Sequence, residues 1–320
     1  MTVRSTALLL SAIALIAVHP AARAGPLERH EFTQVHMGMP VRLVLYAGGA
    51  PAARDAAGGA FARIQTLERI FSDYQPDSEL SRLHGRANEW VPVSAELFEV
   101  LERAVEISRR TGGAFDPTIG PLVSLWRDAR RTRQLPPPGD VAEARARVGW
   151  PHLELDAARR AIQFRVAGMR LDLGGIAKGY ILHDAVRLLA ARGLTRTLVE
   201  AGGDIAAGAA PPGRDGWQID IPAAAGMDEP FRARAARLTR ASLATSGPAS
   251  QFVEIEGVRY SHVIDPRRGL GVTHDVVARV IVADGATADA LATALAAAGR
   301  HGAPTILDRF PDAVASLSIR

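Results

Sequence analysis

The feature that most limits the possible folds is a series of short strand-like runs in the second half of the chain. WQIDIP, RASLATSG, QFVEIEG, VRYSHVID and VVARVIVA are such runs, and turn-forming residues follow most of them. VASLSI adds a last run at residues 314–319. Because strand runs outnumber clean alternation of strand and helix, the pattern predicts an α+β protein with largely antiparallel sheets.

The first half of the chain adds helices to this picture. Residues 41–46 alternate as a strand does, and residues 48–71 begin as a turn and continue as a helix. Ser94 is a suitable N-cap for a helix that reaches Arg110 and that Gly112-Gly113 would end. The runs HLELD and RAIQFRV predict a hairpin, and further helices are expected over residues 176–192 and 286–298.

The N-terminal segment predicts an export signal. MTVR is a short basic start, and the apolar run STALLLSAIALIAV is about 14 residues long, short of a membrane span. Ala22-Arg23-Ala24 then supplies an A-x-A cleavage site. We interpret residues 1–24 as a signal peptide, with an uncleaved anchor as the alternative. Residues 25–320 are then expected to form a single domain, and the proline-rich stretch near residues 131–140 is a possible subdomain boundary.

Charge and cysteine content exclude several classes of function. Removal of residues 1–24 takes away Arg4 and Arg23 and lowers the formal charge from +4 to +2, so the mature chain lacks the basic surface typical of nucleic-acid binding. The chain contains no Cys, which excludes disulfides, thiol chemistry and a lipidated cysteine. No other stretch is long and apolar enough to predict a membrane span.

The stretch LDLGGIAKGY, residues 171–180, holds the only lysine of the chain, Lys178. A strand end, paired glycines and a helix start expose backbone groups to a ligand, and a helix N-terminus favours anions. Lysine adds a compact charge suited to phosphate, although neither the P-loop nor the G-x-G-x-x-G spacing is present. The alternative is a tight turn followed by a solvated lysine.

Asp289 and Thr293 lie four residues apart on a predicted helix rich in Ala and Leu, so their oxygens share one face. A carboxylate and a hydroxyl on a buried face need a partner. Mg²⁺ would be suitable if carbonyl groups, water or substrate phosphate completed its coordination. A buried hydrogen-bond network is the alternative.

Three further stretches carry possible site residues. In YSHVIDPRRG, His262 lies at a strand end, where a proton acceptor could act, or it belongs to a structural turn. Tyr74 follows a helix and could stack on a flat ligand or cover the core edge. The glycine-rich segments TGGAFDPT, EAGGD and ATSG allow close backbone approach to a ligand, but each alone is more typical of a turn.

Taken in this order, these stretches resemble the FAD:protein FMN transferase family, also called the ApbE family. The resemblance extends from Met37-Gly38 to the helix with Asp289 and Thr293. It implies a periplasmic or surface α+β protein that binds FAD and Mg²⁺. Such a protein transfers FMN to a Thr or Ser hydroxyl of an acceptor protein and releases AMP.

The resemblance also assigns roles to individual residues. It implies Gly175 (through its carbonyl), Asp289 and Thr293 as ligands of Mg²⁺, and His262 as the base that deprotonates the acceptor hydroxyl. The residues that would contact FAD are Met37, Tyr74, Ala114, Phe115, Asp116, Asp172, Lys178 and Ile264.

The sequence departs from the family pattern after His262. The family usually has Asp-Pro-x-Thr-Gly-x-Pro there, whereas this chain has Asp265-Pro-Arg-Arg268-Gly-Leu270-Gly271. The substitutions lie near the expected acceptor side and bear on acceptor preference.

Two other functions remain open from the sequence. The same site could hydrolyse FAD to FMN and AMP, or the protein could be an exported FAD carrier without turnover. For the transferase, the expected partner is an acceptor flavoprotein with a Ser/Thr-Gly-Ala-Thr-type motif, such as a subunit of a membrane redox complex. The expected location is the periplasm.

Overall fold

The computed structural model describes residues 26–221, 235–247 and 252–319, so the predicted signal peptide lies outside the described residues. Its largest sheet has seven strands in the order β1-β2-β6-β7-β10-β15-β16, and all neighbours in it are antiparallel. The strands are β1 (Glu28–His36), β2 (Met39–Ala47), β6 (Thr197–Ala201), β7 (Asp204–Ala207), β10 (Ala241–Ser246), β15 (Val276–Val282) and β16 (Val314–Ile319).

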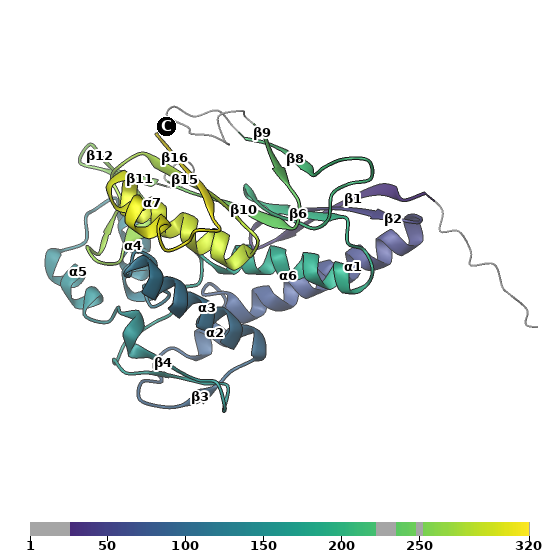
Figure 1. Ribbon diagram of the computed structural model, residues 1–320. Helices are drawn as coiled ribbons and strands as arrows, with labels where there is room; N and C mark the ends of the chain where they lie inside the picture. The colour runs from purple at the N-terminus through teal and green to yellow at the C-terminus, as the bar shows by residue number, and fades with distance from the viewer. Residues whose placement is uncertain (1–25, 222–234, 248–251, 320) are drawn as a thin grey trace, which may run out of the picture.

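Long helices cover one face of this sheet, and a two-stranded ribbon lies on the other (Figure 1). The helices on the sheet are α1 (Ala50–Phe71), α6 (Ala177–Ala191) and α7 (Gly285–Leu307), and α3 (Ala95–Thr111) packs against α1 and α7. The ribbon consists of β8 (Trp217–Asp220) and β9 (Ala235–Leu238). The sheet is therefore buried on both faces over much of its area.

The alternation of side chains in β2 explains this layering. Leu43 and Leu45 point into the main core between the sheet and the helices, whereas Val44 joins Trp217 and Leu238 in the core under the ribbon. Successive strand residues face opposite sides, so a strand with apolar residues on both sides requires cover on both.

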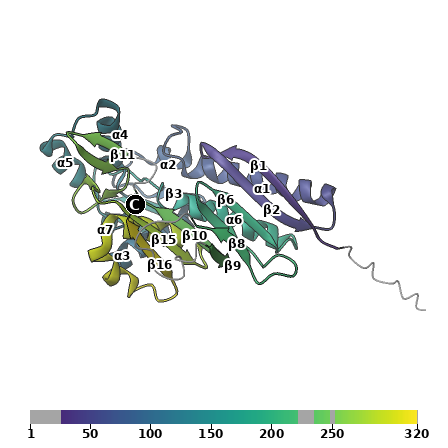
Figure 2. The ribbon, with the colours of Figure 1, turned by 90° about the horizontal axis from the view of Figure 1, so that it is seen from above.

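Smaller elements complete the fold around one end of the large sheet (Figure 2). A third apolar cluster joins α4 (Gly120–Thr132) and α5 (Pro138–Arg145) to two hairpins. The hairpins are β11 (Phe252–Ile255) with β12 (Val258–Ser261), and β13 (Ile264–Asp265) with β14 (Leu270–Gly271). The remaining elements are α2 (Glu79–Arg82), a 3₁₀ turn (Trp150–His152) and a small sheet of β3 (Val91–Pro92), β5 (Ala161–Phe164) and β4 (Leu153–Asp156).

The α+β prediction with mostly antiparallel sheets is confirmed. The stretch near residues 131–140, predicted as a possible subdomain boundary, contains the end of α4 at Thr132, a connection over residues 133–137 and the start of α5 at Pro138. Proline at the start of α5 is compatible with a helix, since the first turn needs no amide donor there. The structure also adds β1 and α4, which the sequence pattern did not predict. None of the helices in the described part of the chain combines the length and apolar character that crossing a bilayer requires.

Helices α6 and α7 cross at two glycines. A Cβ atom placed on Gly179 would lie 2.1 Å from the carbonyl oxygen of Gly285, and one on Gly285 would lie 2.3 Å from the carbonyl oxygen of Gly179. Both distances are far below van der Waals contact, so only glycine allows the two backbones to approach this closely. The crossing fixes the start of α7 against the first turns of α6.

Gly285→Ala should therefore lower the free energy of unfolding by about 1–3 kcal/mol, the usual cost of overpacking. Gly58→Ala is the matched control on α1, because its Cβ would meet no atom within 4 Å. That control should be neutral or stabilising by up to about 1 kcal/mol, since alanine favours a helix more than glycine does. Urea unfolding of both variants tests the crossing, and equal stability of the two would contradict it.

Candidate functional site

The stretch from Asp172 to Lys178 forms the glycine turn and the helix start that the sequence predicted. The predicted strand end was wrong, because residues 171–173 are not in a strand and only Arg170 forms an isolated bridge, with Ile119. The amide of Asp172 donates to the carbonyl oxygen of Pro117 at 2.8 Å, and its Oδ1 accepts from the amide of Gly174 at 2.8 Å. This second bond closes a short turn, after which α6 begins at Ala177. Lys178 lies in the first turn of α6.

The glycine turn lies against α7. A Cβ atom on Gly175 would approach Oγ1 of Thr293 to 3.0 Å and the ring edge of Phe115 to 3.4 Å. The backbone of Gly175, the Thr293 hydroxyl and the loop after α3 therefore meet at one point. Three segments that are far apart in the chain converge here, as the resemblance implied for Gly175 and Thr293.

Asp289 lies one turn before Thr293 on α7 and is 6% exposed. Its Oδ2 accepts from the amide of Gly179 at 3.0 Å, next to the helix crossing. Nζ of Lys178 lies 2.9 Å from Oδ2 of Asp204, which is itself buried and also accepts from the amide of Thr245 at 2.9 Å through Oδ1. The lone lysine thus forms a buried ion pair.

Two carboxylates and one ammonium in this small buried volume leave an excess of negative charge. Burial, and after it the Asp204 carboxylate, raises the pKa of Asp289 to about 7, although Lys178 and the amide of Gly179 favour its ionised form. Burial also raises the pKa of Asp204 against the effect of Lys178. For Lys178, burial opposes the charge, but the two carboxylates outweigh it and raise its pKa.

This arrangement is suited to a divalent cation. Burial, and after it the Asp204 carboxylate, favours the neutral form of Asp289. Thr293 lies one turn further along α7, and its hydroxyl lies against the Gly175 backbone. Within residues 26–221, 235–247 and 252–319, no three His, Asp or Glu side chains gather in a metal-binding arrangement. A cation would therefore use hydroxyl and carbonyl oxygens beside one carboxylate, a donor set typical of Mg²⁺ with substrate phosphate or water.

Tyr74 belongs to a second group of residues around Asp172. Tyr74 is 78% exposed, and the Arg127 guanidinium lies 4.2 Å from the centroid of its ring. One nitrogen of Arg127 lies 2.5 Å from Asp73 and 3.5 Å from Asp172. Burial, and after it the Asp73 carboxylate, raises the pKa of Asp172 to about 6, while Gly174 and Arg127 act in the opposite direction. The exposed ring is thus held at a fixed place and could stack on a flat ligand.

The loop Ala114–Asp116 follows α3 and is buried throughout. Asp116 accepts from the amide and hydroxyl of Thr118 at 2.8 and 2.6 Å, and its other oxygen accepts from the amide of Trp150 at 2.9 Å. Its carboxylate therefore has partners within the chain, although burial still raises its pKa. The loop's role in FAD binding stays a prediction.

Met37 forms the tight turn between β1 and β2 with a positive φ of 52°, which is unusual for a side chain of this size. Its amide donates to Oε1 of Glu68 on α1 at 3.0 Å. The other carboxylate oxygen of Glu68 lies 3.7 Å from Nδ1 of His36, whose ring stacks on Phe61. Glu68 thus fixes the turn to α1.

The strand that follows the Met37 turn lies close to Lys178. A Cβ atom on Gly202, at φ 56°, would lie 2.8 Å from Sδ of Met39 and 3.8 Å from Nζ of Lys178. The start of β2, the turn between β6 and β7 and the first turn of α6 therefore meet. Met37 is two residues from Met39 in this contact. The structure therefore brings Met37, predicted to contact FAD, close to Lys178, whose charge is suited to the FAD phosphates.

His262 lies in the bend between β12 and β13, and Ile264 begins β13. The side chain of Ile264 is buried in the small cluster with Trp126, so only its backbone can serve a ligand. Strand β13 contacts α7, the helix of Asp289 and Thr293. The segment that carries the predicted base therefore packs on the element that carries the predicted metal ligands.

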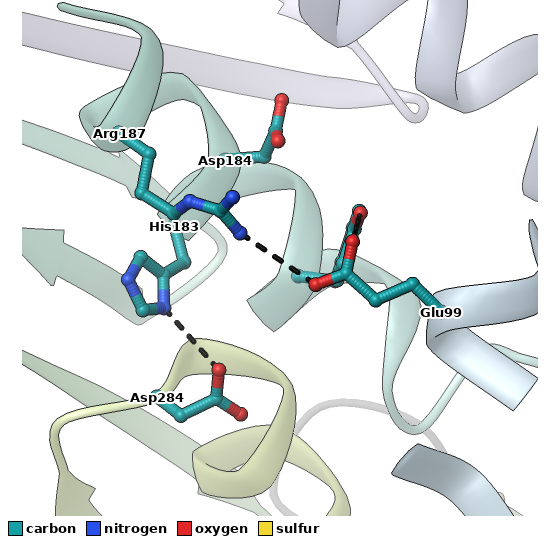
Figure 3. Close-up of a pocket in the computed structure, with 6 residues that line it drawn as sticks. Glu99, His183, Asp184, Arg187 and Asp284 are labelled. Atoms are coloured by element: carbon teal, nitrogen blue, oxygen red, sulfur yellow. Dashed lines mark hydrogen bonds and ion pairs between the residues drawn. The ribbon is translucent and has the colours of Figure 1, made fainter. Parts of the chain in front are cut away.

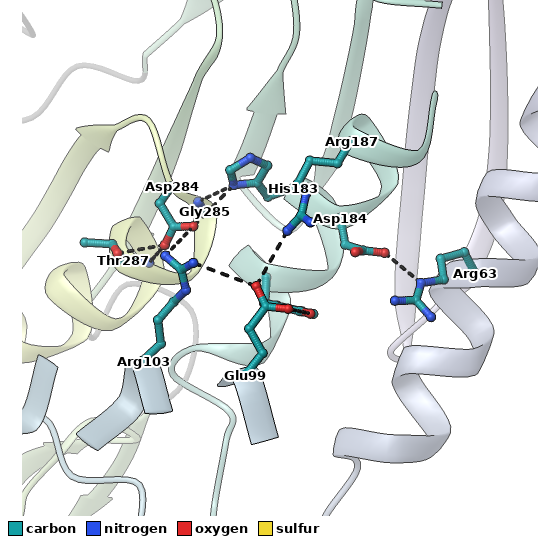
Figure 4. A network of polar contacts seen from close by, with 10 residues as sticks. Arg63, Glu99, Arg103, His183, Asp184, Arg187, Asp284, Gly285 and Thr287 are labelled. Atoms are coloured by element: carbon teal, nitrogen blue, oxygen red, sulfur yellow. Dashed lines mark hydrogen bonds and ion pairs between the residues drawn. The ribbon is translucent and has the colours of Figure 1, made fainter. Parts of the chain in front are cut away.

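A polar network outside the predicted site joins α3, α6 and α7 (Figure 4). His183 Nδ1 accepts from the amide of Gly285 at 2.8 Å and lies 3.6 Å from Asp284, the N-cap of α7. Burial lowers the pKa of His183, so its neutral form accepts this bond. On α3, Glu99 accepts from the hydroxyl of Tyr180 at 2.8 Å.

The cavity in this network measures only about 10 Å³ and lies among the polar side chains that Figure 3 shows. A cavity of this size holds at most one water molecule. The network is therefore a structural support for the helix crossing, with no space for an organic ligand.

Sequence reasoning missed three side chains that position the site. Asp204 stood in EAGGD, which resembles an ordinary turn; Arg127 stood in a helix that was not predicted; and Glu68 resembled a solvated residue of α1. Only Asp204 had a signal, because a buried lysine requires a carboxylate partner.

The sequence profile of the ApbE family matches residues 37–317. The FAD:protein FMN transferase of Treponema pallidum is 35% identical over 266 residues, which cover 78% of this chain and 73% of that protein. The enzyme of the same name from Salmonella typhimurium is 30% identical over 75% of this chain and 70% of its own length.

Solved structures agree with these relatives. The apo form of the flavinyl transferase ApbE from Pseudomonas stutzeri superposes with a TM-score of 0.81 at 27% identity, covering 92% of each chain. The ApbE protein of Thermotoga maritima gives 0.78 at 28% identity, covering 90% of this chain and 93% of its own. The fold is that of the flavin transferases. The chain belongs to the ApbE family.

Metal-free protein should lose stability as the pH rises from about 4 to about 7. In that range folded Asp289 keeps a proton that the unfolded chain, with an ordinary carboxyl pKa of 3.8, has released. Asp289→Asn should flatten the curve of unfolding free energy against pH by up to about 1.4 kcal/mol per unit.

Urea unfolding in EDTA between pH 4 and pH 8 measures this curve. Asp308→Asn, at the exposed end of α7, is the control and should keep the wild-type slope. An unchanged slope in Asp289→Asn would show that this carboxyl is already ionised in the folded protein.

Glu68→Ala should weaken FAD binding about three- to tenfold, because the turn at Met37 loses its acceptor and one hydrogen bond contributes about 0.5–1.5 kcal/mol. Glu68→Gln retains an oxygen acceptor and should restore most of the affinity. Quenching of FAD fluorescence measures the dissociation constant, with Glu102→Ala on the exposed face of α3 as the control. Equal affinities of Glu68→Ala and wild type for FAD would show that the turn at Met37 does not contribute to FAD binding.

Proposed function

We propose that this chain is a Mg²⁺-dependent FAD:protein FMN transferase that attaches FMN to a Thr or Ser hydroxyl of an acceptor protein and releases AMP. Family membership and the relatives' names support the transferase class with FAD as donor. The observation that carries the metal dependence is the buried Asp289, beside Thr293 and Gly175, in a cluster with excess negative charge.

The residues of this chain suggest a division of tasks. Lys178, held by Asp204, supplies a compact positive charge beside the glycine turn for the phosphates of FAD. Tyr74, under Arg127, and the turn at Met37 would contact the flavin, while Asp172 holds the intervening turn. Mg²⁺ on Asp289, Thr293 and the Gly175 carbonyl would offset negative charge on the pyrophosphate.

The transfer then proceeds by direct displacement. His262 accepts the proton of the acceptor hydroxyl, whose oxygen forms a bond to the phosphorus of the FMN half. The bond from that phosphorus to the bridging pyrophosphate oxygen breaks, and AMP leaves with the bond's electron pair. No nucleophile of the enzyme takes part, which is consistent with the absence of Cys.

The N-terminal segment supports the proposal that the protein acts after export. The basic start, apolar run and A-x-A site are typical of a cleaved signal peptide, so we place the mature enzyme in the periplasm. Its proposed partner is an exported or membrane-bound flavoprotein with a Ser/Thr-Gly-Ala-Thr-type motif.

A single gel tests the function. Mature protein is mixed with FAD, MgCl₂ and a small domain that bears Ser-Gly-Ala-Thr, and flavin fluorescence that survives SDS is recorded together with AMP release. Covalent fluorescence on the domain, with AMP released only in its presence, is expected. AMP release without an acceptor would instead identify an FAD pyrophosphatase, and bound FAD without AMP would identify a carrier.

Asp289→Ala should abolish transfer at millimolar MgCl₂, because it removes the one carboxylate of the proposed metal site. Asp308→Ala, on the exposed end of the same helix, should retain wild-type transfer. Full activity in Asp289→Ala would show that the metal site is misplaced.

A further inference from the structure

A cavity of about 280 Å³ lies beside the β13–β14 hairpin, and the proposed reaction assigns no role to it. Its walls come from three places: Tyr260 in β12, the hairpin with Arg267 and Arg268, and the segment through His274. Ala297 of α7 forms part of its floor. The volume suits a side chain or a small polar group and exceeds that of a few waters.

The charge of this cavity is positive. Arg267 makes a two-pronged ion pair with Asp265, at 2.9 and 3.2 Å, so these two charges offset each other. The guanidinium of Arg268 has neither a hydrogen bond nor an ion pair with the residues that the structure describes. Nδ1 of His274 is buried and lacks a hydrogen-bond partner within the same residues. One unpaired cation and one unsatisfied ring nitrogen remain to contact a ligand.

The cavity is close to the place where the acceptor hydroxyl must react. Ala297 lies four residues after Thr293 on α7, which is about 6 Å along the axis and on the same helix face. Tyr260, which also lines the cavity, is two residues before His262. The cavity therefore lies beside both the proposed metal ligands and the proposed base.

We infer that this cavity binds an acidic side chain of the acceptor protein, within about four residues of the Thr or Ser that receives FMN. Arg268 would pair with the carboxylate, and Ala297 would contact the methylene groups of its stem. An extended peptide advances about 3.3 Å per residue, so a few residues span the distance from the hydroxyl. The inference rests on the proposed function.

The position of Arg268 favours a protein-borne carboxylate over a nucleotide phosphate. Arg267 and Arg268 are exposed at the rim, where a second protein can reach them. Lys178 already supplies a buried cation at the glycine turn, where the FAD phosphates are proposed to bind. Arg268 stands in the turn where the family pattern has Thr, so it is a specificity-determining residue of this chain.

The test uses mature protein and three forms of a fluorescently labelled acceptor domain, in which the two residues on each side of Ser-Gly-Ala-Thr are Glu, Gln or Lys. The dissociation constant of each domain is measured directly, and KM and kcat for flavin transfer are measured in parallel. Wild type should bind the Glu form about tenfold more tightly than the Lys form. Arg268→Glu should reverse this order, and the change should appear in the acceptor KM rather than in kcat.

Arg54→Glu, an exposed arginine of α1 without a partner in the described structure, is the matched control and should keep the wild-type order. Higher salt should reduce the preference, since rim charges are screened. Equal binding of the three forms to wild type would overturn the inference. A shift in the KM for FAD alone in Arg268→Glu would also overturn it and assign the cavity to a phosphate.

Binding and transfer separate the two proposals. A charge preference in binding without covalent flavin on any acceptor would contradict the transferase and support the acidic-acceptor cavity. Covalent flavin on all three forms at equal rates and affinities would support the transferase and contradict the cavity.

Discussion

The backbones of α6 and α7 meet at Gly179 and Gly285. A Cβ atom on either glycine would lie only 2.1 or 2.3 Å from the carbonyl oxygen of the other, so neither position can carry a side chain. This approach lets the amide of Gly179 donate to Asp289, a residue of the other helix. Lys178 precedes Gly179, so the same crossing places the lone lysine near the carboxylate of α7. The site therefore depends on two positions that have no side chain.

Three ionisable groups gather at this crossing, and their charges do not balance. Asp204 comes from the sheet, Lys178 from α6 and Asp289 from α7, and all three are largely buried. Buried charges are costly unless they are paired, and here one carboxylate exceeds the available positive charge. The excess is what a bound cation would offset. The polar network of His183 and Asp284 holds the same helices without entering this cluster.

Much of the site could be predicted because its signals are local. The i, i+4 spacing of Asp289 and Thr293 and the paired glycines before Lys178 are visible in single short segments. Asp204 and Glu68 were not recognised, since their roles come from contacts with Lys178 and Met37, which are distant in the chain. A residue pair of this kind has no periodicity or spacing that a single sequence can show.

By itself, the sequence determined the α+β class, most strands and helices, and the order of the motifs, because alternation, capping residues and glycine turns act over a few neighbours. The tertiary structure alone decided that Gly175 faces Thr293, that Lys178 pairs with Asp204, and that a basic cavity lies beyond Thr293 on α7. The physical reason is packing. Burial sets which charges must find partners, and only the folded chain determines which distant residues are close enough to serve.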